Sequence, residues 1–223
     1  EGYSRQVVNL ESVTYDGIGG GVRIADITRK VDEYLQLSVY RQTSSVGMSG
    51  VISDYYDSLQ TLLGDPSLDN SIDQHIENFF NDLQQMAETP ERSSTRAAVI
   101  ASGQAMAREI SQLALGLEQL RFQADDDLSA SLDALNQKME ELYFTNESIA
   151  EAHAFGSPTA TLLDKRDALL EDISQYIDIR VNERENETVD VYAGNGLGLI
   201  DFGYSRFEYD NIATIDDLYA DNE

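Results

Sequence analysis

Hydrophobic side chains recur at two different spacings along the chain, and the first segment has the alternating spacing of β-strands. Residues 5–16 are rich in Val, Thr and Tyr, and residues 22–28 place Val22 and Ile24 on one face. The glycine-rich residues 17–21 between these runs supply the positive φ angles of a chain reversal. The pattern predicts an N-terminal β-hairpin.

From about residue 29 the hydrophobic positions recur at helical spacing, up to residues 64–66, Gly-Asp-Pro, which are suited to end a helix. This predicts one long helix, loosened around residues 44–47. A second helix is expected from about Ser71, with Asp69 or Ser71 as its N-cap. Its inward side chains are expected to be Ile72, Ile76, Phe79, Phe80, Leu83 and Met86.

Residues 91–157 contain no proline and have a strongly helix-forming composition. Positions in this segment repeat in alternating steps of four and three, which is the a/d seam of a coiled coil. A continuous helix of roughly 60 residues would be about 90 Å long, which predicts an elongated bundle. The seam positions are Leu128, Leu132, Leu135, Met139, Leu142, Asn146, Ile149 and His153, after an earlier stretch at Leu113, Leu117, Leu120 and Ala124.

Another helix is predicted after Pro158, because proline suits the first turn of a helix. Alternating positions then predict strands at 179–181 and 189–191, with further short strands at 199–200 and 207–209. The apolar positions of this helix are Leu162, Leu163, Leu169, Leu170, Ile173, Tyr176 and Ile177.

Together these segments predict a mainly α fold with β: an elongated helical bundle with long coiled-coil-like helices, an N-terminal β-hairpin and a C-terminal β-rich portion. Residues 1–28 are expected to form a connector toward a missing terminal domain, and residues 29–178 the elongated helical bundle domain. Residues 179–223 are either a β-rich continuation or the start of a second domain. The first residues have no initiator Met, so we expect the chain to be the middle of a longer protein.

Composition narrows the possible partners. The 223 residues carry 41 Asp and Glu against 15 Lys and Arg, a formal net charge of -26. Because a nucleic-acid binder must neutralise phosphates, this charge excludes nucleic acid and makes an anionic membrane surface a poor partner. No apolar run approaches the length of a membrane-spanning helix. Residues 1–41 hold five basic and six acidic side chains, so nearly all of the negative charge lies beyond them.

The candidate motifs for chemistry do not meet their requirements. The chain has no cysteine, which excludes disulfides and thiolate chemistry. Val22 stands where a dinucleotide-binding loop needs glycine, and the glycines at 194–198 fail the same test. The three carboxylates at 125–127 point in different directions on a helix, so a solvated acidic face is favoured over a metal site.

The two histidines are isolated from any nucleophile. His75 is predicted to be a surface or half-buried residue, and His153 a polar position in the helical seam. We therefore predict no catalytic, cofactor-binding or metal residues, no cofactor, and a protein that is not an enzyme. The numerous aromatic residues pack within the chain or form a subunit interface, with the first favoured, and include Tyr34, Tyr40, Tyr55, Tyr56, Tyr143 and Phe144.

Three stretches together resemble the hook-associated protein 1 family of bacterial flagellar axial proteins. They are residues 2–6, Gly-Tyr-Ser-Arg-Gln; residues 21–35, from the end of the hairpin into the first helix; and residues 162–179, which begin Leu-Leu-Asp-Lys-Arg-Asp-Ala-Leu-Leu. Their order and spacing agree with that family over almost the entire chain. Within the third stretch, the Arg166 and Asp167 pair is expected to position the short helix against the long one. Its buried side would be Leu169, Leu170 and Ile173.

The resemblance implies a structural subunit that joins hook to filament in the bacterial flagellum, without catalysis. It implies an extracellular location, reached through the flagellar type III export system without a cleaved signal peptide. The implied partners are the flagellar hook protein, the second junction protein, further copies in the full-length assembly, and an export chaperone bound through the missing C-terminus. Without the terminal polymerisation helices, the chain is expected to be monomeric. The alternative is an acidic helical binding module or an extracellular stalk or adhesin-like protein.

Overall fold

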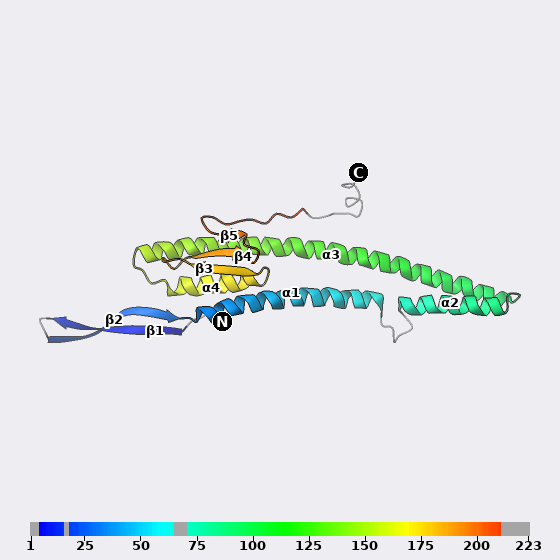
Figure 1. Cartoon of the computed structure of the whole chain (residues 1–223), viewed down its shortest axis with the longest axis horizontal. Helices are drawn as coiled ribbons and strands as arrows, with labels where there is room; N and C mark the ends of the chain where they lie inside the picture. The colour runs from blue at the N-terminus through cyan, green and yellow to red at the C-terminus, as the bar shows by residue number, and fades with distance from the viewer. Residues whose placement is uncertain (1–4, 16–17, 65–70, 211–223) are drawn as a thin grey trace. The chain divides into compact units, whose positions relative to one another are not determined.

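A computed structural model describes residues 5–15, 18–64 and 71–210. The mainly helical fold with an N-terminal hairpin and C-terminal strands is confirmed (Figure 1). The elements in chain order are β1 (Arg5–Tyr15), β2 (Ile18–Lys30), α1 (Glu33–Leu63), α2 (Ile72–Glu88), α3 (Ser93–Ala154), α4 (Ala160–Ser174), β3 (Ile179–Glu183), β4 (Val189–Ala193) and β5 (Gly198–Ile200).

The described residues separate into two compact units. Those within Glu1–Ser49 and Ala130–Tyr209 form unit 1, and those within Gly50–Ser129, together with Asp210, form unit 2. Helices α1 and α3 contribute to both units. The division into three parts at residues 28 and 178 stays a prediction.

The hairpin of β1 and β2 is antiparallel, and its second strand begins earlier than the sequence predicts. Because β2 starts at Ile18, the interpretation of the glycines at 19–21 as the reversal is wrong, and residues 16–17 lie outside the described residues. Gly21 has a φ of +107° near a register shift in the pairing with β1. Glycine adopts this angle without steric cost, so it suits an irregular position in a strand.

Helix α1 begins at Glu33, after the start predicted near residue 29, because β2 continues through Lys30. The Asp32 carboxylate accepts a hydrogen bond from the backbone N–H of Leu35 at 3.1 Å. This bond satisfies one of the free N–H groups in the first turn and fixes where the helix starts.

The predicted loosening of α1 at residues 44–47 is wrong, since the helix continues through them. Gly47 has a packing reason instead. A Cβ atom added there would lie 2.4 Å from the carbonyl oxygen of Gln175, directly after α4. Glycine therefore allows the two backbones of unit 1 to approach closely at this point.

Replacing Gly47 with Ala should destabilise unit 1 although alanine favours helices. The added methyl group forces α1 and the end of α4 apart, at a cost of about 1–3 kcal/mol, which exceeds the helix-propensity gain of about 0.5–1 kcal/mol. Gly50 on the same helix has nothing within 4 Å of an added Cβ, so Gly50→Ala should stabilise. Urea unfolding followed by circular dichroism measures both, and stabilisation by both variants would contradict the close approach.

Helix α2 is correctly placed but its surroundings differ from the prediction. Ser71 is the N-cap, since its hydroxyl oxygen accepts a hydrogen bond from the N–H of Gln74 at 3.3 Å. The expected inward face is wrong at Ile76 and Phe80, which are 37% and 62% exposed. The other four side chains of that face are half-buried, and α2 contains no buried residue. Across the described part of unit 2, only Ser71 is buried.

Helix α3 has 62 residues, which confirms the long helix, but the seam is buried only over its middle positions. Leu135, Met139, Leu142, Asn146 and Ile149 are buried, as predicted. Leu128 is 44% exposed and His153 is also exposed, so the seam prediction is wrong at both ends. Neighbouring elements therefore bury α3 only along this middle stretch of the seam.

The hydrophobic core lies in unit 1, where α1, α3, α4 and the small sheet meet. The antiparallel sheet has the order β3-β4-β5. The strand expected at 207–209 is wrong, because these residues are not in a strand. The core side chains are Tyr40, Leu135, Met139, Leu142, Leu169, Leu170, Ile173, Ile179, Val189, Val191, Ala193, Leu199 and Ile200.

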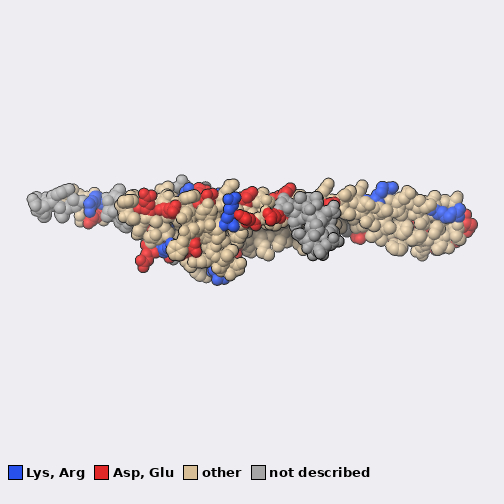
Figure 2. Space-filling view, turned by 90° about the horizontal axis from the view of Figure 1, so that it is seen from above, with Lys and Arg blue, Asp and Glu red and all other residues tan. Residues whose placement is uncertain are grey.

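Charged side chains occupy part of the described surface. In the face drawn in Figure 2, acidic side chains form several groups, basic side chains occupy a few separate positions, and most of the remaining described surface is uncharged. Among the described residues, no helix combines the length and the apolar character needed to cross a membrane.

Candidate functional site

The clearest polar site is a group of buried ion pairs that ties the hairpin to α4. Arg29, near the end of β2, places Nε 3.0 Å from Oδ1 of Asp164 and Nη2 2.5 Å from Oδ2 of Asp167. The three side chains are 9%, 8% and 12% exposed. Buried charges are costly unless they are paired, so this geometry holds β2 and α4 in one arrangement.

Arg166 extends the same group toward the sheet. Its Nε donates to Oδ1 of Asp167 at 3.0 Å, and its Nη1 donates to Oε1 of Glu183 at 3.2 Å and to the backbone carbonyl of Glu187 at 2.7 Å. The expectation that Arg166 and Asp167 position α4 against the long helix is therefore wrong. Their partners lie in β2, in β3 and in the turn after it.

We call Arg29, Asp164, Arg166 and Asp167 the charge cluster. Burial by itself would lower the pKa of Arg166, but the carboxylates of Asp167 and Glu183 outweigh burial and raise it. Two positive and two negative side chains balance inside the cluster. Its net charge of zero is one reason why four ionised groups can be this well buried.

Tyr40 of α1 lies close to the charge cluster and is 4% exposed. Burial raises the pKa of its phenol above the ordinary value of 10.0, and the negative charge of Asp167 raises it further. The phenol therefore stays protonated in the folded state at a pH where exposed tyrosines ionise.

This shift predicts a loss of stability in alkali. Above about pH 10 the unfolded chain releases the Tyr40 proton while the folded chain keeps it, so the free energy of unfolding falls as pH rises. Tyr40→Phe removes this contribution. Between about pH 9 and about pH 11, the free energy of unfolding of the wild type should therefore fall relative to that of the variant. Tyr34→Phe is the control, since Tyr34 is 81% exposed. A difference for Tyr40→Phe that does not change with pH would contradict the shift.

Two asparagines of α3 fix the strand region by pairing with backbone groups. Asn146 donates to the carbonyl of Val189 at 2.8 Å and accepts from its N–H at 3.2 Å. Asn136 makes the same pair of bonds with Phe207, both at 2.8 Å. A side-chain amide has the donor and acceptor of a peptide group. Asn146 therefore pairs with the start of β4 as a neighbouring strand would, and Asn136 holds the non-strand segment at Phe207 in the same way. Neither role was predicted, although a polar residue in an apolar seam is a usable signal for Asn146.

The other candidate polar residues do not converge on a site. His75 is half-buried, as predicted, with Nε2 4.0 Å from Oε2 of Glu109. His153 lies on the surface, with Nδ1 3.7 Å from Oε2 of Glu187. Asp127 accepts a hydrogen bond from the Tyr55 hydroxyl at 2.8 Å. Over residues 5–15, 18–64 and 71–210, no group of three or more His, Cys, Asp or Glu side chains could hold a metal.

The aromatic residues divide between packing and exposure. The favoured interpretation, packing within the chain, is confirmed for Tyr40 and for Tyr143, whose ring lies 5.5 Å from that of Tyr204. It is wrong for Tyr34 and Tyr56, which are 81% and 68% exposed. Phe144 is 53% exposed, but its ring packs edge-on against Tyr143 at 5.6 Å.

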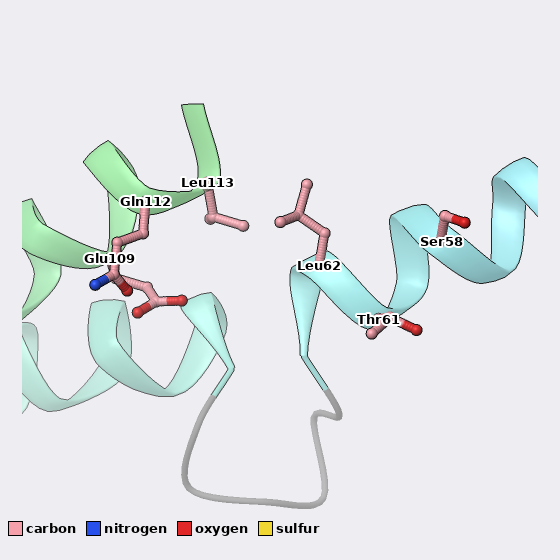
Figure 3. Close-up of a pocket in the computed structure, with 6 residues that line it drawn as sticks. All are labelled: Ser58, Thr61, Leu62, Glu109, Gln112 and Leu113. Atoms are coloured by element: carbon pink, nitrogen blue, oxygen red, sulfur yellow. The ribbon is translucent and has the colours of Figure 1, made fainter. Parts of the chain in front are cut away.

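Unit 2 contains a shallow hollow of about 360 Å³ between α1 and α3 (Figure 3). Leu62 and Leu113 extend toward one another across it. The lining has one carboxylate and no imidazole or amine, so it presents no acid/base pair. Its six residues are Ser58, Thr61, Leu62, Glu109, Gln112 and Leu113.

Fold and site together define a helical structural module, in which the buried polar groups hold secondary-structure elements together. Comparison with known sequences identifies its family. Residues 56–207 match the family described as "Flagellar hook-associated protein FlgK helical domain". The chain therefore belongs to the FlgK family of flagellar hook-associated proteins.

Individual relatives agree with this assignment. The chain is 24% identical over 194 residues to flagellar hook-associated protein 1 of Bacillus subtilis, a match to 82% of this chain. It is 22% identical over 213 residues to the protein of the same name from Escherichia coli, a match to 92% of this chain. In both cases the chain spans 38% of the relative's length.

A solved structure supports the fold. The flagellar hook junction protein FlgK from Burkholderia pseudomallei superimposes with a TM-score of 0.61 at 24% sequence identity, over 75% of this chain and 28% of that one. The resemblance to the hook-associated protein 1 family is thus confirmed. Family membership assigns the protein to the flagellum and to a structural role without catalysis, which confirms that prediction as well.

Proposed function

We propose that this chain is the helical part of a structural subunit that joins the hook to the filament of the bacterial flagellum. The observation that carries the proposal is the family match over residues 56–207. The charge cluster supports it, since a subunit that transmits mechanical load needs its projecting elements fixed to its core. In this proposal the chain binds neighbours through surfaces and performs no chemistry.

The finer parts of the proposal concern partners and location. The full-length protein would contact the hook protein on one side and the second junction protein on the other, and further copies of itself around the junction. An export chaperone would bind its C-terminal region. The protein would reach the cell exterior through the flagellar type III export system without a cleaved signal peptide.

The proposal also covers the organisation of the chain. Residues 1–28 would connect toward a terminal domain, residues 29–178 would form the helical bundle domain, and residues 179–223 would continue or begin a β-rich part. This chain by itself would be monomeric. Its acidic surface supports that expectation, because a net charge of -26 makes copies repel one another.

Deletion of the parent gene tests the function. We expect non-motile cells that keep their hooks, lack filaments and release filament subunits into the medium. Restoring the intact gene should restore motility, whereas a copy carrying a core-disrupting change such as Leu170→Asp should not. Normal filaments in the deletion strain would contradict the proposal. Filaments that persist while attachment to other cells is lost would favour an adhesin-like stalk.

A further inference from the structure

The buried apolar side chains are distributed very unevenly between the two units. All fifteen of the buried hydrophobic residues in the described chain lie in unit 1, from Tyr40 to Ile200. In the described part of unit 2 the one buried residue is Ser71, which is polar. Burial of apolar surface is the main favourable contribution to folding, so the two units have very different sources of stability.

Unit 2 also leaves many large apolar side chains in contact with solvent. Each of its three helical segments contributes some of them. They are Val51, Ile52, Tyr56 and Leu63 of α1, Ile76 and Phe80 of α2, and Ile100, Ile110, Leu115, Leu117 and Leu128 of α3, all between 37% and 68% exposed.

The contacts between the helices of unit 2 are half-buried or exposed. Phe79 of α2 lies against Gly103 of α3, and Leu62 of α1 lies against Gly116 of α3. The Tyr55 hydroxyl donates to Asp127, and His75 lies 4.0 Å from Glu109. Polar contacts of this kind at the surface contribute little to stability. Helices held by such polar contacts and by half-buried apolar side chains gain less stability from packing than helices with fully buried side chains.

From these observations we infer that unit 2 is a conformational device, a segment that opens while unit 1 stays folded. The boundary falls inside two continuous helices, after Ser49 in α1 and before Ala130 in α3. No break, proline or glycine pair separates the two parts of α3 at this point. Helix α3 thus has buried core residues on one side of the boundary and none on the other.

Opening of unit 2 leaves the charge cluster and the core intact, because every residue of both belongs to unit 1. Helices α1 and α3 therefore each have a part in unit 1 that stays folded and a part in unit 2 that opens. The inference does not depend on the proposed function, since it follows from burial within this chain.

Hydrogen exchange of the full 223-residue chain, read by mass spectrometry on overlapping peptides, tests the inference. We expect amides of α2 and of α3 before Ser129 to exchange about a thousandfold faster than those of residues 135–149, since local opening free energies fall with the density of buried contacts. Protection should rise within a few residues along the continuous helix. Uniform protection through the whole of α3 would overturn the inference.

Two matched substitutions make the test sharper. Leu83→Ala in α2 removes a half-buried side chain, and we expect it to speed exchange in unit 2 about tenfold while residues 135–149 keep their protection. Ile173→Val in α4 removes one methylene from a side chain that is 0% exposed, and should speed exchange in unit 1 alone. The conservative change at Ile173 keeps the protein folded. If either variant speeds exchange equally in both units, the two units unfold as one and the inference is wrong.

Discussion

Replacing Leu170 with Asp should unfold unit 1. Leu170 is 1% exposed in the core formed by α4, α3 and the sheet. Loss of a buried leucine costs about 2–5 kcal/mol, and an unpaired carboxylate in an apolar site adds several more. Because whole domains are stable by about 5–15 kcal/mol, we expect no cooperative unfolding transition for unit 1 in urea.

Leu197→Asp is the matched control for this change. Leu197 lies in the same unit but is 52% exposed, so the carboxylate stays in water. Its expected effect on the free energy of unfolding is within about 0.5 kcal/mol. Equal urea midpoints for Leu170→Asp and wild type would show that α4 does not pack in a core.

The second large effect is expected from Arg166→Met. The change keeps much of the side-chain volume but leaves the carbonyl of Glu187 without its charged donor and Asp167 with one cation instead of two. Removing one partner of a buried ion pair typically costs about 3–5 kcal/mol. Urea unfolding should show a loss of this size, and exchange of the β2 amides should accelerate as the hairpin loosens.

A surface pair provides the control for Arg166→Met. Arg23 contacts Glu11 at 2.8 Å, but the two side chains are 67% and 56% exposed. Arg23→Met should therefore cost less than about 1 kcal/mol. The double change Arg166→Met with Asp167→Leu should recover part of the loss, because it removes a buried charge together with its partner. If Arg166→Met and Arg23→Met cost the same, the charge cluster contributes nothing beyond a surface ion pair.

The parts of the fold that could be predicted from the sequence are those where burial repeats at a regular spacing. The seam around Met139 and Leu142 and the inward side of α4 at Leu170 and Ile173 were predicted correctly, because one face of each helix is covered by its neighbours. Helix ends with a specific capping residue, such as Ser71, were equally readable. At such positions a hydrogen bond between residues close in sequence fixes where the helix begins.

The failures occurred where spacing does not determine surroundings. The apolar side of α2 has the correct helical period, but a period does not say whether another surface covers it, and Phe80 is exposed. Gly47 was expected to loosen α1. Its actual role is to let the carbonyl of Gln175 approach closely, and the sequence near Gly47 gives no sign of a contact so far along the chain. Only half of the charge cluster was predicted. Arg166 and Asp167 were identified as a pair in the sequence, whereas nothing near Arg29 or Asp164 indicates that they contact each other across more than a hundred residues.

Burial of the charge cluster has a consequence for the effect of dissolved salt. Mobile ions screen the attraction between exposed charges in water beyond a distance of about 10 Å at 0.1 M salt and about 3 Å at 1 M, and they act far less on charges enclosed by protein. The Arg23–Glu11 contact on the hairpin surface will therefore weaken in concentrated salt. The buried ion pairs between Arg29 and α4 will not weaken in this way. The base of the hairpin therefore stays attached to α4 at low and at high salt concentration.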